Sequence, residues 1–257
     1  MRVVFFRLRV VLVLLFMAFP ANAYESIEVE GGTTIRGRVR LEGSPPHVDV
    51  RKVVYDQQAC GVAVPDESLV LGQEQEIRYA VVMLEGVTRG KAVEPKAYNV
   101  IDQHGCRFVP HVLVAVVGQW LLVANQDLVQ HFPAAASLTT RSKLFDYSLA
   151  PSGRGVELLS KPGIFKVNCT GRHTWMDGYV VVTDHPYVAV TDAAGRYELR
   201  DVPPGRYVLK IWHERLGSIE RSIEAQPGRR QPEDFAFRLP TEEVNATVPP
   251  PAHRSGG

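Results

Sequence analysis

Three side chains that bind soft metal ions lie within eight positions of one another, at Cys169, His173 and Met176. A thiolate and an imidazole beside a thioether suit copper, and a blue-copper site takes two His, one Cys and a long axial Met. The second His must come from elsewhere. His131 is the best candidate, because it follows a strand pattern and an Asn-x-Asp sequence at 125–127. We therefore predict a copper site formed by His131, Cys169, His173 and Met176.

The scarcity of methionine supports this assignment. After residue 23 only Met83 and Met176 remain, and Met83 lies in an apolar strand pattern. Zinc is the alternative metal, although structural zinc sites prefer more Cys or His to a thioether. His104 and His111 are alternative ligands, with a structural role favoured for each. The alternative to any metal is that the Cys and Met only pack and the His is only solvated.

Strand patterns must position these residues. Short apolar or alternating runs occupy 34–41, 79–84, 112–117, 120–123, 163–169 and 178–183, with turn residues between them. This spacing is typical of a β-sandwich. Helical periodicity is nowhere sustained, and short turns or one helix are expected within 134–160. We predict an all-β chain in which loops at adjacent strand ends bring His131 to the Cys169 loop.

The N-terminal residues 1–23 have the pattern of a secretory signal. A basic start precedes an apolar run at 10–19, and the segment ends in a small-residue cleavage site at 21–23. An uncleaved anchor is the alternative, but the run is short for a membrane span. The mature chain is therefore expected to start near Tyr24, to be periplasmic or secreted, and to have no transmembrane span.

Beyond the signal, the composition changes near residue 184. We expect a first sandwich domain at 24–184. Short strands and turns after it predict a compact meander at 185–240. Residues 241–257 are rich in Pro and weakly hydrophobic, which predicts a disordered tail.

Composition excludes some functions. The formal net charge is +1 and no basic tract follows the signal, so nucleic acid is not an expected partner. No nucleophile elbow, phosphate loop or dinucleotide fingerprint is present. We therefore expect that the protein is not an enzyme.

Several motifs resemble known families. The Cys-x-Gly-x-His-x-x-Met run at 169–176 resembles the copper loop of cupredoxins, and 162–165 resembles the start of their Cys strand. Segments 81–86, 105–111 and 174–176 resemble exported bacterial proteins described as plastocyanin-like or methylamine-utilisation proteins. Segment 191–207 resembles carboxypeptidase regulatory-like domains. The resemblance implies a cupredoxin-like Greek-key sandwich followed by a small transthyretin-like sandwich.

The cupredoxin resemblance also implies a function. One type 1 copper would carry single electrons between redox partner proteins. Cupredoxins present the Cys-loop His through an apolar patch, so Trp175 and Phe132, which adjoin ligand residues, are expected to form a docking face. The alternative is that both rings turn inward and pack the site. The alternative is a non-catalytic binding or scaffold module of the cell envelope with a vestigial or incidental metal site.

The remaining cysteines complete the sequence-based expectations. If Cys169 binds copper, Cys60 and Cys106 are left over in an oxidising compartment. The count favours a disulfide between them. Two unpaired buried thiols remain the alternative.

Overall fold

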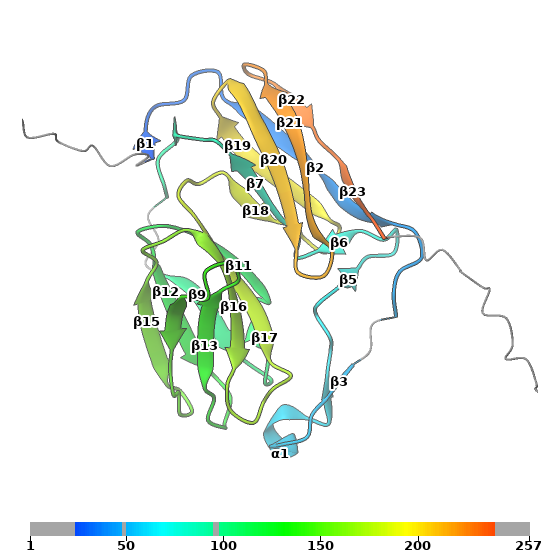
Figure 1. Ribbon diagram of the computed structural model, residues 1–257, viewed down its shortest axis with the longest axis vertical. Coiled ribbons are helices and arrows are strands. Elements are labelled where there is room, and N and C mark those ends of the chain that lie inside the picture. Colours follow the sequence, from blue (N-terminus) through cyan, green and yellow to red (C-terminus); the bar gives the residue numbers. More distant parts are fainter. Residues whose placement is uncertain (1–23, 48–49, 95–97, 240–257) are drawn as a thin grey trace, which may run out of the picture.

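A computed structural model describes residues 24–47, 50–94 and 98–239. The expected signal at 1–23 and the expected tail at 241–257 lie outside the described residues. Within them the chain is strands and loops with one short helix, α1 (Gln57–Cys60), so the predicted all-β class is confirmed (Figure 1). No helix in the described part of the chain is long and apolar enough to span a membrane.

Two sheets form the first sandwich, the lower one in Figure 1. The first sheet has the order β10 (Phe108–Val109), β9 (Asn99–Gln103), β12 (Trp120–Asn125), β15 (Arg154–Leu158). The second has the order β11 (Val112–Val116), β17 (Asp177–Thr183), β16 (Gly163–Cys169), β13 (Pro133–Ser137), β14 (Lys143–Asp146). Buried side chains of both sheets form one apolar core, which includes Leu121, Val167 and Val180. Cys169 lies in this core at the end of β16.

The second sandwich also has two sheets and its own core. One sheet has the order β18 (Val188–Val190), β7 (Val81–Glu85), β20 (Gly205–His213), β21 (Gly217–Ala225). The other has the order β19 (Arg196–Val202), β2 (Thr33–Glu42), β22 (Arg230–Pro232), and β23 (Phe235–Arg238) also pairs with β2. The sandwich therefore combines strands from both ends of the described chain.

The expected domain division at residue 184 does not match this pairing. β2 and β7 precede that boundary, yet β2 pairs with β19 and β7 lies between β18 and β20. The alternation of Ile35, Val39 and Leu41 in β2 does create an apolar face, as the sequence predicts. Alternation defines a buried face but not the sheet that receives it, so the partner strand was not predictable from the pattern.

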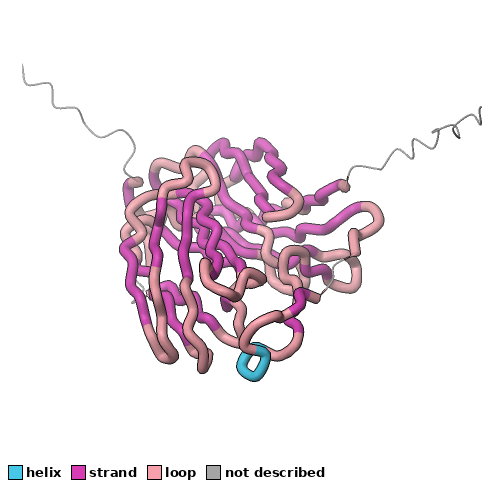
Figure 2. Tube along the Cα trace, turned by 60° about the horizontal axis from the view of Figure 1, so that its bottom comes forward, coloured by secondary structure: helices cyan, strands magenta, loops and turns pink. Residues whose placement is uncertain are grey.

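The helix also lies outside the region where one was expected. Segment 134–160 contains β13, β14 and β15, and its Gly, Ser and Pro residues lie in or near the turns between them. The helix instead occurs in a segment between β3 (Arg51–Lys52) and β4 (Ala63–Val64), which pair with each other. We call residues 50–68 the covering segment. Figures 1 and 2 both place its helix beside the loops that close one end of the first sandwich.

Four further short strands complete the described fold. β1 (Glu25–Ser26) pairs with β8 (Arg89–Gly90), and β5 (Val70–Leu71) pairs with β6 (Ile77–Arg78). The two sandwiches meet through β17, which is buried on both faces. Val180 and Val182 contribute to the first core, while Tyr179 and Val181 pack in a third cluster with Trp212 of β20. A strand covered on both faces has a continuous apolar sequence.

Candidate metal centre

Three of the predicted ligand residues converge at one end of the first sandwich. The side chains of His131, Cys169 and His173 each place a possible ligand atom within 4.8 Å of the others. All three are buried, with 0%, 2% and 3% of their surfaces exposed. The pairing of Pro133 with Cys169 in neighbouring strands β13 and β16 brings His131 beside the thiol. The pairing of residues 36 positions apart therefore brings together a thiol and two imidazoles, which are ligands for soft metal ions.

The two imidazoles face each other through Nδ1. The Nδ1 atoms of His131 and His173 lie 2.8 Å apart. His131 Nε2 is 2.9 Å from Asp127 Oδ2, and His173 Nε2 is 2.8 Å from Asp56 Oδ2. A carboxylate accepts a hydrogen bond, so each Nε2 carries the proton and each Nδ1 offers its lone pair. Two lone pairs at this separation need a cation between them, either a shared proton or a metal ion.

Cys169 has the chemistry of a metal-binding thiol. Burial alone raises the pKa of Cys169, but the adjacent His131 imidazole and the N–H groups of Phe132 and Gly171 lower the pKa overall. The Phe132 N–H lies 3.4 Å from Cys169 Sγ. The thiolate is the form that binds metals, so this environment favours a ligand.

Met176 is buried in the same core as Cys169, with 1% of its surface exposed. Its backbone N–H donates to His173 O at 3.0 Å, and its carbonyl accepts from Cys169 N–H at 3.3 Å. These bonds close the loop between β16 and β17, and they hold the backbone of Met176 next to that of Cys169. An axial contact from its sulfur to a metal remains a proposal.

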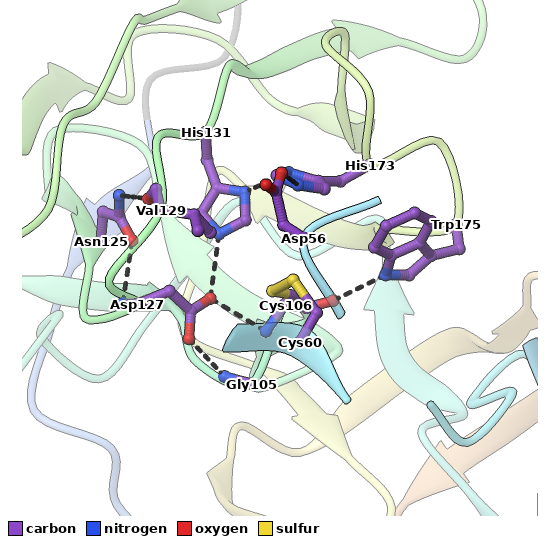
Figure 3. The surroundings of a disulfide bond; sticks show 10 residues. All are labelled: Asp56, Cys60, Gly105, Cys106, Asn125, Asp127, Val129, His131, His173 and Trp175. Atoms are coloured by element: carbon purple, nitrogen blue, oxygen red, sulfur yellow. Dashed lines mark hydrogen bonds and ion pairs between the residues drawn. A yellow bond between two sulfur atoms is a disulfide. The ribbon is translucent and has the colours of Figure 1, made fainter. Parts of the chain in front are cut away.

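Asn125 and Asp127 hold the loop that carries His131. Asn125 Nδ2 donates to the carbonyls of Val129, Leu149 and Ala150, while its Oδ1 accepts from Asp127 N–H. Asp127 also accepts from the N–H groups of Gly105 and Cys106, at 2.6 and 2.9 Å (Figure 3). Burial raises the pKa of Asp127, but the bond to His131 and these N–H donors outweigh it and hold the pKa low. The carboxylate is therefore both charged and fixed.

Cys60 and Cys106 form a disulfide, as predicted, with their Cα atoms 5.2 Å apart (Figure 3). Cys60 ends α1 in the covering segment, and Cys106 lies between β9 and β10. The bond therefore ties the covering segment to the first sandwich. Cys169 is left as the free cysteine, which agrees with the predicted division of the three cysteines.

Trp175 is buried, with 8% of its surface exposed, so its ring packs in the site as the alternative expectation describes. Its ring lies 5.1 Å from that of His173, and its Nε1–H donates to Cys106 O at 3.2 Å. The ring is thus removed from water while its N–H keeps a hydrogen-bond partner, as a buried Trp requires. Phe132 is 38% exposed and packs over Gly171, where an added Cβ would lie 2.6 Å from its ring. Only Phe132 of the two remains available to a partner.

The alternative ligands lie outside this cluster. His104 is exposed, and His111 is buried with its Nε2 bonded to Glu214 of the second sandwich. The sequence analysis missed Asp56 as a partner of His173. Nothing in its sequence neighbourhood indicates this role, because the contact spans 117 positions. The spacing of Asp127 and His131, four residues apart, was the available signal for the other carboxylate.

No protein-family profile matches the chain, and no curated protein matches it. Solved structures similar to about a third of the chain include copper proteins. A copper-containing nitrite reductase from Thermus scotoductus is 24% identical over 36% of this chain and 23% of its own, with a TM-score of 0.31. A reduced amicyanin variant is 20% identical over 35% of this chain and 85% of its own, with a TM-score of 0.31.

A purple cupredoxin from Nitrosopumilus maritimus is 23% identical over 34% of this chain and 99% of its own, with a TM-score of 0.30. The chain thus spans less than a quarter of the nitrite reductase. At these TM-scores the likeness carries no conclusion about chemistry, which must rest on the side chains themselves.

Proposed function

We propose that this chain is an exported protein that binds one type 1 copper ion and carries single electrons between redox partners. The observation that supports the proposal is the buried cluster of His131, Cys169 and His173, with both Nδ1 atoms and the thiol directed at one another. Met176 would provide the weak axial ligand. Bound copper would supply the one-electron Cu(II)/Cu(I) couple.

The chain's own residues would keep the ligands in place during electron transfer. Asp127 orients His131, Asp56 orients His173, and the Phe132 N–H donates to Cys169 Sγ. Fixed ligands reduce the rearrangement between the two oxidation states, and hydrogen bonds at the Cys sulfur tune the potential. The low exposure of the three ligands keeps water away from them.

Export and partner docking belong to the same proposal. The disulfide is stable in an oxidising compartment, which suits the periplasm or the outside of the cell. Phe132 borders the cluster and is partly exposed, so we propose that it contributes to an apolar contact with a redox partner. The second sandwich would be the transthyretin-like, regulatory-like module that residues 191–207 resemble, with a structural or binding role.

Copper titration tests the proposal. Cu(II) added to the purified metal-free protein should give one copper per chain and an intense visible thiolate-to-copper band. Cys169→Ser should abolish the band, and His131→Ala should disrupt copper binding. His104→Ala is the matched control, because His104 is exposed and outside the cluster, and it should leave the spectrum unchanged.

Copper binding without that band would contradict the electron-transfer proposal and favour the scaffold module with an incidental metal. Retention of the band in His131→Ala would show that another residue supplies the second imidazole.

A further inference from the structure

Asp56 has an unusual place in its own helix. It occupies the position before α1, where an Asp side chain commonly accepts a hydrogen bond from the first turn. Here the carboxylate makes no such bond, and the backbone has φ 51°, in the left-handed region. The carboxylate instead accepts from His173 Nε2, 117 positions away. The geometry thus directs this side chain to the candidate metal centre and not to its helix.

Two anchors hold Asp56 over His173. On its N-terminal side, Arg51 donates to the Trp175 carbonyl and pairs with Asp177 and Asp66. On its C-terminal side, the disulfide fixes Cys60 to the first sandwich. The covering segment therefore lies over the loop that carries His173. Only 3% of the surface of His173 is exposed. Figure 3 shows the Asp56 side chain extending from this segment to the His173 imidazole.

Two carboxylates contact the imidazoles of the cluster, while the Arg172 guanidinium carbon lies 5.5 Å from the centre of the Tyr55 ring beside Asp56. Asp56 forms an ion pair with His173, and Asp127 forms one with His131. Within the described residues, neither carboxylate forms an ion pair with a Lys or Arg. In the copper-bound form the Cys169 thiolate would add a third negative charge to these two carboxylates. Opposite charges attract more strongly as the charge on the ion increases, so these carboxylates favour a doubly charged ion over a singly charged one.

We propose that Asp56 is a positioning residue for the metal centre. It holds His173 with Nδ1 toward the ligand cluster and biases bound copper toward Cu(II), together with Asp127. This inference rests on the proposed copper function. The Asp127 side chain is 6% exposed and that of Asp56 is 44% exposed, so Asp127 has the larger effect per charge.

The substitution Asp56→Asn removes the negative charge of the side chain but keeps its shape. The amide oxygen still accepts from Nε2–H, and Asn tolerates the left-handed backbone. We expect the thiolate-to-copper band to remain, while the Cu(II) to Cu(I) binding ratio falls about tenfold, equivalent to a potential about 59 mV higher for a one-electron couple. The matched control is Asp146→Asn, because its side chain is 47% exposed and contacts Lys143 instead of a cluster residue. It should leave the potential unchanged.

A second variant tests positioning without metal. Asp56→Gly removes the carboxylate and suits φ 51°. Nitrogen NMR of the metal-free protein should show the His173 proton on Nε2 in the wild type, and a mixture of the two ring-nitrogen forms in Asp56→Gly. Far-ultraviolet circular dichroism checks that the variant is folded.

The outcomes separate the two proposals. An Asp56→Asn potential equal to that of Asp146→Asn, with the wild-type band intact, would overturn the role of Asp56 and leave the copper function standing. An unchanged His173 proton form in Asp56→Gly would overturn it as well. A wild-type protein without the band would instead contradict the proposed function itself.

Discussion

At the scale of single residues, each imidazole of the cluster is held from the side opposite its free nitrogen. Asp127 and Asp56 accept from the two Nε2 atoms, and Trp175 packs against the His173 ring. Such contacts fix the orientation of metal-binding histidines and their loss typically weakens metal sites. The neighbours of the ligands therefore fix the orientation of both imidazoles in the proposed copper site.

Trp175→Ala should damage the site as well as the fold. Truncating this buried ring should lower the free energy of unfolding by about 3 kcal/mol and leave His173 without its packing partner. We expect a shifted or weakened thiolate-to-copper band, measured after copper loading, together with the loss of stability in a denaturant titration. Trp120→Ala is the matched control, because Trp120 is 45% exposed and should change stability by no more than about 0.5 kcal/mol. An unchanged spectrum in Trp175→Ala would contradict a packing role.

At the scale of elements, the covering segment has little secondary structure of its own. It contains one four-residue helix and the two-residue strands β3 and β4. Elements this short are not stable alone, so the disulfide and Arg51 must hold the segment against the sandwich. The position of Asp56 consequently depends on these two anchors.

Replacing both Cys60 and Cys106 by Ala should loosen this segment. The bond closes a loop with a sequence separation of 46, for which the chain-entropy relation gives about 4 kcal/mol of stability. We expect a loss of that size in a denaturant titration and greater protease sensitivity near α1. Peptide mapping of the unreduced wild type should recover the two cysteines linked. Recovery of Cys169 in the bridge would contradict both this disulfide and the copper assignment.

At the scale of the whole molecule, the two sandwiches share a buried contact that includes polar groups. Glu214 follows β20 of the second sandwich and bonds His111, which precedes β11 of the first. The adjacent His213 is also buried. Desolvation, with the nearby charges of His111 and Arg215, lowers the pKa of His213 to about 4. The second sandwich therefore contains, next to Phe237, a buried histidine that is neutral in the folded protein above about pH 4.

This histidine predicts a loss of stability in acid. Above pH 6.5 it is neutral in both the folded and the unfolded chain. Between pH 6.5 and about 4 only the unfolded chain binds the proton, so the free energy of unfolding decreases as the pH falls. Wild type should lose about 3 kcal/mol more than His213→Asn between pH 7 and pH 4, measured by denaturant titration at each pH. An equal loss in the two proteins would show that His213 is not held neutral.

The local features of this protein follow from the order of its residues. Alternating and continuous apolar runs predicted the strands, because the period of the side chains follows from the backbone geometry of a strand. The spacing of Cys169, His173 and Met176 indicated a soft-metal loop, because these ligands lie in one short segment. The count of three cysteines indicated the observed disulfide once Cys169 was assigned to the metal.

Which distant segments meet depends instead on the packing of the complete chain. Apolar alternation in β2 and β7 is satisfied by any apolar partner, so it could not show that these strands complete the second sandwich. The burial of Trp175 and the contact of Asp56 with His173 depend in the same way on where the covering segment folds. A sequence pattern records what a side chain requires, such as burial or a hydrogen bond. The packing of the whole chain determines which residue meets that requirement.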